Sequence, residues 1–68
     1  MKYYKIKIKN TDIYVDAVII GGEPKIQIIP SWEKETAAIF EEDKAKGYLK
    51  MLNENHKLIE YELEEVER

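Results

Sequence analysis

The first thirty residues alternate between apolar and polar side chains, and this alternation constrains the fold more than any other feature of the chain. In the segment 3–9, Tyr4, Ile6 and Ile8 share one face and lysines occupy the other. A period of two residues is typical of a strand with one buried face. Asn10-Thr11-Asp12 has the composition of a tight turn. We therefore expect a second strand that runs antiparallel to the first.

The turn at Asn10-Thr11 sets a register between these two strands in which apolar residues meet apolar residues. It places Ile6 opposite Val15 on an inner face and Lys7 opposite Tyr14 on an outer face. A slip of one residue would set core positions against solvent positions along the whole ladder. The same register predicts the inner pairs Ile8–Ile13 and Tyr4–Ala17 and the outer pairs Lys9–Asp12, Lys5–Asp16 and Tyr3–Val18.

A second turn is expected at Gly21-Gly22, because two glycines supply the positive φ angles that short hairpins prefer. Glu23-Pro24 continues this turn, and a third strand over 25–29 ends at Pro30. The two turns define one inner face, so we predict a three-stranded antiparallel meander. On that face the second turn pairs Ala17 with Ile26 and Val15 with Ile28.

The middle of the chain predicts one helix, with two possible starting points. Asn53-Glu54-Asn55 is a suitable C-terminal stop. Trp32, Ala38 and Phe40 are apolar at even spacing, which favours an extended segment before the helix. A single helix over 31–55 is the alternative. Acidic residues Glu41, Glu42 and Asp43 lie where a helix dipole favours negative charge, and the apolar stripe consists of Ala45, Tyr48, Leu49 and Leu52, with Met51 at its edge.

The last segment alternates again, with Ile59, Tyr61 and Leu63 on one face and glutamates on the other. This glutamate stripe matches the lysine stripe of the first strand, and opposite charges on neighbouring strands stabilise by roughly 0.2–1 kcal/mol per pair. We therefore place the last strand beside the first. The predicted fold is a single α+β domain over residues 1–68, with sheet order 3-2-1-4 and one helix packed on the inner face.

Composition narrows the range of functions. The chain has no cysteine, which excludes disulfides and thiolate metal sites. His56, the single histidine, has no second imidazole to form a metal site, and we expect an exposed residue with a structural or incidental role. Gly21-Gly22 lacks the signature of a phosphate loop, and the carboxylates are scattered rather than paired in a cleft. We predict a non-enzymatic protein without metal or cofactor.

Charge and hydropathy bear on location and partners. The net charge is −3, and acidic residues on the lysine face cancel its field, so we do not expect a nucleic-acid partner. The longest apolar run, 17–20, is far too short to span a membrane. The N-terminal alternation of lysine and isoleucine is not a signal peptide. We expect a cytoplasmic protein whose partner is another protein.

Two surfaces are candidates for binding. An apolar and aromatic patch on the predicted outer sheet face, rimmed by charge, is typical of a contact surface for a partner or for a homodimer. Strands also tolerate such residues without any function. The acidic final strand is either a solvated face or a surface that engages a basic groove. The candidate partner-binding residues are Tyr3, Tyr14, Val18, Ile20 and Ile29 in the patch and Glu60, Glu62 and Glu64 on the strand.

Ala37-Ala38-Ile39-Phe40 forms an Ala-x-x-Phe-like step, and Ala45-Lys46-Gly47-Tyr48-Leu49 opens an Ala/Leu helix before the closing acidic strand. This half of the chain resembles small α+β proteins encoded by phages and prophages of low-GC Gram-positive bacteria. The resemblance rests on packing residues. It implies a non-enzymatic accessory protein of the host cytoplasm that binds and inhibits a host macromolecule, including anti-defence proteins of the anti-CRISPR type. The alternative is an oligomeric small-ligand binder, or sponge, whose pocket forms only between subunits.

Overall fold

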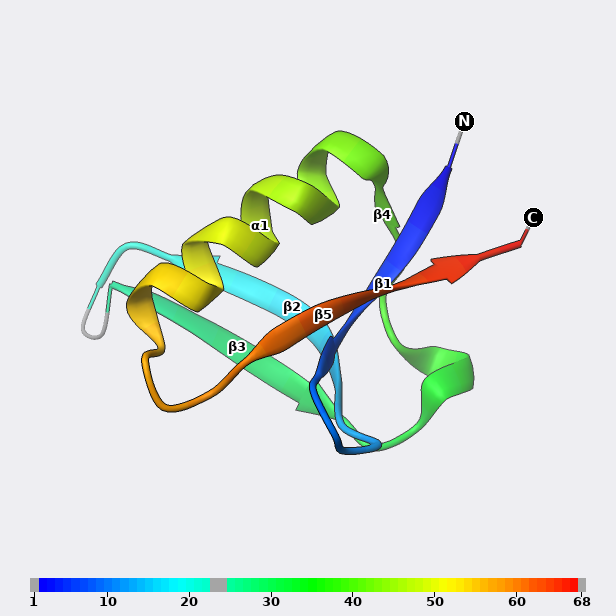
Figure 1. Cartoon of the computed structure of the whole chain (residues 1–68), viewed down its shortest axis with the longest axis horizontal. Coiled ribbons are helices and arrows are strands. Elements are labelled where there is room, and N and C mark those ends of the chain that lie inside the picture. Colours follow the sequence, from blue (N-terminus) through cyan, green and yellow to red (C-terminus); the bar gives the residue numbers. More distant parts are fainter. Residues whose placement is uncertain (1, 23–24, 68) are drawn as a thin grey trace.

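The computed structural model describes residues 2–22 and 25–67 and places one helix across an antiparallel sheet (Figure 1). The predicted α+β class and strand order are confirmed, with the final strand beside the first. Glu23 and Pro24 of the predicted turn lie outside the described residues. The elements are β1 (Tyr3–Ile8), β2 (Tyr14–Ile20), β3 (Ile26–Ser31), a one-turn 3-10 helix (Lys34–Thr36), β4 (Phe40–Glu41), α1 (Glu42–Asn55) and β5 (Tyr61–Val66).

Strand β1 lies at the centre of the sheet and is paired along both edges. It pairs with β5 from end to end on one edge, and β2 and β4 share the other edge. The predicted pair Lys7–Tyr14 is confirmed. At the start of β1, however, Tyr3 and Tyr4 pair with Glu41 and Phe40 of β4. The predicted pairs Tyr3–Val18 and Tyr4–Ala17 are therefore wrong.

An irregularity in β2 explains this difference. Val15 lies opposite Pro30 and Ala17 lies opposite Ile29, so Asp16 is an extra residue between two paired positions. An extra residue of this kind bends the strand and reverses the alternation of faces beyond it. β2 turns away from β1 at this point. The N-terminal part of that edge of β1, at Tyr3 and Tyr4, is therefore open to β4.

The same irregularity corrects the predicted faces of β2. Val18 lies opposite Ile28, and Ile20 lies opposite Ile26, on the side of the sheet that α1 covers. The prediction that Val18 and Ile20 belong to the outer face is wrong for this reason. The predicted pairs Ala17–Ile26 and Val15–Ile28 are wrong as well, because Ala17 lies opposite Ile29 and Val15 lies opposite Pro30.

Strand β3 runs through Pro30 instead of ending before it. The Gly21 N–H donates to the Lys25 carbonyl at 2.8 Å, which makes these residues a hydrogen-bonded pair between β2 and β3. Bonding alternates along an antiparallel strand, so the backbone groups of Ile26, Ile28 and Pro30 point away from β2. Proline lacks an N–H, but at this position no bond to β2 is lost.

The core lies between the sheet and α1. Its buried members are Ile6, Val15, Ile26, Leu52 and Tyr61. The helix contributes the predicted stripe: Ala45 and Leu52 are buried, and Tyr48, Leu49 and Met51 are half-buried. The alternative of one helix over 31–55 is wrong, because the segment before α1 is extended apart from its single 3-10 turn.

Candidate functional site

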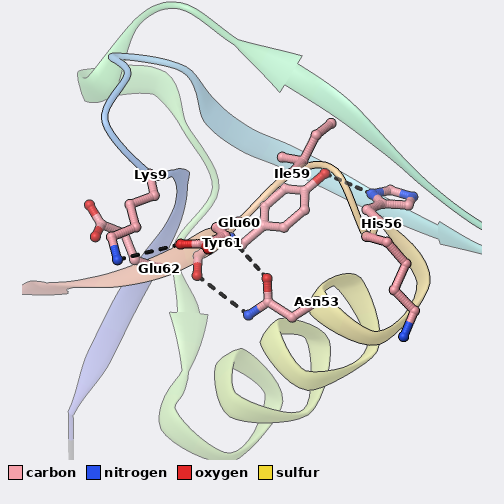
Figure 2. A pocket seen from close by; sticks show the side chains of 8 residues that line it. Lys9, Asn53, His56, Ile59, Glu60, Tyr61 and Glu62 are labelled. Carbon is pink, nitrogen blue, oxygen red and sulfur yellow. Dashed lines mark hydrogen bonds and ion pairs between the residues drawn. The ribbon is translucent and has the colours of Figure 1, made fainter.

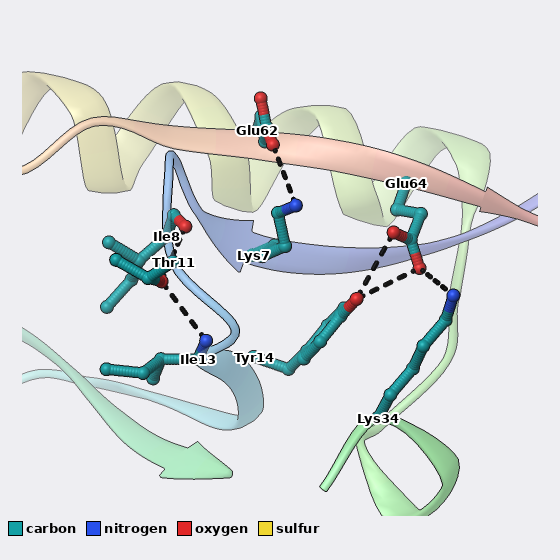
Figure 3. Close-up of polar contacts among 8 residues, drawn as sticks. All are labelled: Lys7, Ile8, Thr11, Ile13, Tyr14, Lys34, Glu62 and Glu64. Carbon is teal, nitrogen blue, oxygen red and sulfur yellow. Dashed lines mark hydrogen bonds and ion pairs between the residues drawn. The ribbon is translucent and has the colours of Figure 1, made fainter. Parts of the chain in front are cut away.

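The outer sheet face, predicted as a binding patch, is partly covered by the chain itself. The 3-10 helix lies over it, and the Lys5 ammonium donates to the Lys34 carbonyl. Tyr14 is only 5% exposed beneath this segment. Its hydroxyl lies 3.2 Å from both carboxylate oxygens of Glu64, which also pairs with the Lys34 ammonium at 3.2 Å (Figure 3). The aromatic ring of Tyr14 is thus buried and makes its contacts within the chain.

Hydrogen bonds and charges within the cluster of Tyr14, Lys34 and Glu64 shift the pKa of each of these residues. Burial and the hydrogen bond to Glu64 raise the pKa of Tyr14. Burial alone would raise the pKa of Glu64, but hydrogen bonds from Lys34 and Tyr14 outweigh it and lower that pKa. The same Glu64 carboxylate raises the pKa of Lys34. The cluster holds the segment before β4 against the sheet.

The other predicted acidic residues also have internal partners. Glu62 pairs with Lys7 at 3.3 Å, and Glu60 pairs with Lys9 at 3.4 Å (Figures 2 and 3). The hydrogen bond from Lys7 to Glu62 raises the pKa of this lysine. The lysine and glutamate stripes therefore meet as predicted. Their partner-binding role stays a prediction, on a surface whose charge is largely balanced within the chain.

The remaining members of the predicted patch are separated. Tyr3 is half-buried on β1, between its strand partners Glu41 and Val66. Ile29 stays on the outer face and is 46% exposed, next to Ala17. Val18 packs against the core on the opposite face. The structure does not bring the five apolar candidates together as one surface.

The loop between α1 and β5 forms a different site. The helix ends where the His56 N–H donates to the Leu52 carbonyl at 2.8 Å. The side chain of Asn53 then fixes the start of β5 as a neighbouring strand would. Its Oδ1 accepts from the Tyr61 N–H at 2.9 Å, and its Nδ2 donates to the Tyr61 carbonyl at 3.4 Å (Figure 2).

His56 links three parts of the fold. Its Nε2 lies 3.1 Å from the Ile26 carbonyl oxygen of β3, and its Nδ1 lies 2.8 Å from the Tyr61 hydroxyl of β5. A carbonyl only accepts, so Nε2 carries the proton, and in the neutral ring Nδ1 accepts from the Tyr61 hydroxyl. Burial raises the pKa of Tyr61. The expectation of an exposed His56 is wrong, because the ring is half-buried and bonded at both nitrogens.

Two hollows flank this loop. A polar hollow of about 420 Å³ lies on the side of Lys9, Asn53 and Glu60. An apolar hollow of about 360 Å³ lies on the other side. Leu58 borders the apolar hollow and is fully exposed. The apolar hollow is lined by Ile8, Ile28, His56, Lys57, Leu58, Ile59 and Tyr61.

Sequence reasoning missed this site because its parts come from three distant segments. One indication of the site is visible in the sequence: Leu58 and Ile59 are adjacent apolar residues between a helix stop and an alternating strand. One of two consecutive apolar residues at a strand start cannot face the core, since neighbouring side chains point to opposite sides.

Comparison with known proteins found no matching family model, no matching curated protein and no matching solved structure. In the described ranges 2–22 and 25–67, no three His, Cys, Asp or Glu side chains come together as ligands for a metal ion. Within the same ranges, no helix combines the length and the apolar character needed to cross a membrane.

Proposed function

We propose that this chain is a non-enzymatic binding protein that docks on a partner protein through the loop between α1 and β5. The observation that carries the proposal is the full exposure of Leu58 beside an apolar hollow. Burial of a leucine side chain is favourable by about 1.5–3 kcal/mol. Leu58 does not gain this energy within its own chain, and a partner that covers it would supply that burial.

The hydrogen bonds that hold the loop between α1 and β5 in place favour binding. His56 anchors its beginning to β3 and β5, and Asn53 anchors its end at Tyr61. A loop that is fixed before binding loses little conformational entropy when a partner arrives. Leu58 and Ile59 are therefore presented on a rigid support, which is typical of the anchor residues of an interface.

The chemistry of the surface indicates the kind of partner. Lys57 lies at the rim of both hollows and is exposed. The site thus fits a protein segment with an apolar side chain for the hollow and a carboxylate for Lys57. The resemblance to small phage-encoded proteins supports a host macromolecule as the partner and inhibition, including inhibition of a defence system, as the effect.

A matched pair of variants tests this proposal. The native chain, Leu58→Ser and Ile39→Ser are each used as bait in a Gram-positive lysate, and affinities for a stoichiometric partner are then measured. Ile39 is exposed but lies before β4, away from the loop. We expect Leu58→Ser to weaken binding about ten- to hundredfold and Ile39→Ser to leave it unchanged. Absence of a stoichiometric partner, or equal binding by Leu58→Ser, overturns the proposal.

A second candidate is a small-ligand binder. The apolar hollow of about 360 Å³ is within the size range of small-molecule sites, and it favours an apolar ligand. Mass spectrometry of the purified protein under native conditions tests this function. A bound small molecule that is absent from Leu58→Ser supports it, and a chain without ligand at every charge state contradicts it.

A further inference from the structure

The segment between β3 and β4 closes over the outer sheet face without burying any of its own residues. Residues 32–36, which we call the strap, lie between Ser31, which is paired with Tyr14, and Ala37, which is buried. Every residue of the strap is exposed, and its large apolar side chain, Trp32, is 69% exposed. Burial of apolar surface is the main force that holds an element to a fold. The strap is not held in this way.

Polar contacts hold the strap in place. Inside its 3-10 turn, the Thr36 N–H donates to the Glu33 carbonyl at 3.3 Å, which is long for a bond of this type. Between the strap and the sheet, the Lys5 ammonium donates to the Lys34 carbonyl, and the Lys34 ammonium pairs with Glu64 at 3.2 Å (Figure 3). The side chains of this ion pair are 59% and 31% exposed. Ion pairs exposed to this degree contribute little to stability.

Two side chains of the sheet are buried beneath the strap. Tyr14 is 5% exposed and Lys5 is 6% exposed. The hydrogen bond from Tyr14 to Glu64 joins β2 to β5 and does not involve the strap, so it persists without the strap. A charged ammonium is favourably hydrated, and water therefore replaces the contact of Lys5 with the strap once the strap has moved away. The core between the sheet and α1 is not disturbed by this exchange.

We propose that the strap opens as a unit while the sheet and the helix stay folded, and that its opening uncovers Tyr14 and Lys5. Segments with few buried apolar contacts open at a lower free energy than the whole domain unfolds. Ser31 and Ala37 stay in place on either side, the first in the β2–β3 ladder and the second in its buried position.

Opening changes the outer face of the sheet. Ser31 lies opposite Tyr14, and Ile29, two positions earlier on β3, lies opposite Ala17 and is 46% exposed. Tyr14 and Ile29 are thus accessible together only in the open form. The strap is a built-in cover for one end of this face. The proposal is independent of the docking loop, because the contacts that hold the strap involve no residue between α1 and β5.

The reactivity of the Lys5 ammonium measures the opening. Trace reductive methylation with formaldehyde and cyanoborohydride, followed by digestion and mass spectrometry, compares the rate at Lys5 with the rate at exposed Lys50 of the same chain. We expect Lys5 to react at least about tenfold more slowly than Lys50, because only the open form admits the reagent. The rates are measured without urea and in about 1 M urea, since global unfolding responds steeply to urea and a local opening does not.

A matched pair of variants connects the opening to the strap. Lys34→Ala removes the ion pair with Glu64, and Lys46→Ala removes a similar exposed pair, with Glu42, on the helix. We expect the rate at Lys5 to rise about two- to fivefold in Lys34→Ala and to stay at the native value in Lys46→Ala.

Three outcomes overturn the proposal. In the first, Lys5 of the native chain reacts as fast as Lys50, so the strap does not cover it. In the second, Lys5 reacts at a rate that rises with urea as steeply as global unfolding does. In the third, the two variants give equal rates at Lys5. A slow rate at Lys5 that is insensitive to urea and raised by Lys34→Ala alone supports it.

Discussion

The Nε2 atom of His56 and the carbonyl oxygen of Ile26 lie 3.1 Å apart, although the two residues are 30 positions apart in the chain. Ile26 begins the edge strand of the sheet, and His56 follows the last residue of the helix. The contact therefore joins the end of the helix to β3. It also supports the loop that presents Leu58.

Replacement of His56 by alanine should destabilise the fold. The change leaves the Tyr61 hydroxyl and the Ile26 carbonyl without this partner, and a buried polar group left unpaired costs about 1–3 kcal/mol. Urea unfolding at neutral pH measures the loss. Lys57→Ala is the control, because Lys57 is exposed and its loss should change stability by less than about 0.5 kcal/mol. Equal midpoints for the two variants would falsify the role assigned to His56.

The bulge at Asp16 predicts a difference between two neighbouring residues of β2. Val18 packs against the core, whereas Ile19 is 43% exposed on the outer face. Val18→Ser should cost about 2 kcal/mol, because it removes buried methyl groups and places a hydroxyl there. Ile19→Ser should cost less than about 1 kcal/mol. The unfolding free energies of the two variants show which of the two residues faces the core. A larger loss for Ile19→Ser than for Val18→Ser would support the uninterrupted alternation expected from the sequence.

Glu64→Gln should reduce stability in a way that depends on pH. The pKa of Glu64 is lowered in the folded chain, chiefly because hydrogen bonds from Lys34 and Tyr14 outweigh the opposing effect of burial. The unfolded value is about 4.3. The ionised carboxylate thus contributes its full stabilisation above that pH, and the contribution disappears as the pH falls through the folded pKa.

The difference between the native chain and Glu64→Gln should therefore be largest at neutral pH and shrink below about pH 5. Urea midpoints from pH 7 to acid measure it. Glu65→Gln is the control, since Glu65 and Lys2 are both exposed and their charged atoms are 3.9 Å apart. A difference for Glu64→Gln that persists unchanged in acid would contradict the assignment.

The strand neighbours were predictable because charge patterning is visible in a sequence. Lys7 and Lys9 meet Glu62 and Glu60 across β1 and β5, as the two stripes indicated. The turn at Asn10-Thr11 was also predictable. Asn10 has a φ of 64°, which asparagine tolerates better than most residues, and the Thr11 hydroxyl donates to the Ile8 carbonyl at 2.7 Å.

The candidate site was not predictable in the same way. The predicted patch assumed that β2 alternates without interruption, and one extra residue at Asp16 moved Val18 and Ile20 to the other face. Tyr14 was expected to be available for binding, but the segment before β4 folds back over it. Local alternation states which residues share a face. It does not state where a strand bends or which later segment covers that face.

The sequence by itself determined the four longer strands, the helix stripe and the pairing of β1 with β2 and β5, but not the pairing of β1 with β4, because periodicity and charge act between residues that are close in the chain or regularly spaced. Only the tertiary structure decided the faces of β2, the burial of Tyr14 and the position of His56. Each of these depends on contacts between groups far apart in the chain. His56 reaches Ile26 because the helix packs across the sheet and ends beside β3. That packing also leaves Leu58 exposed beside the apolar hollow.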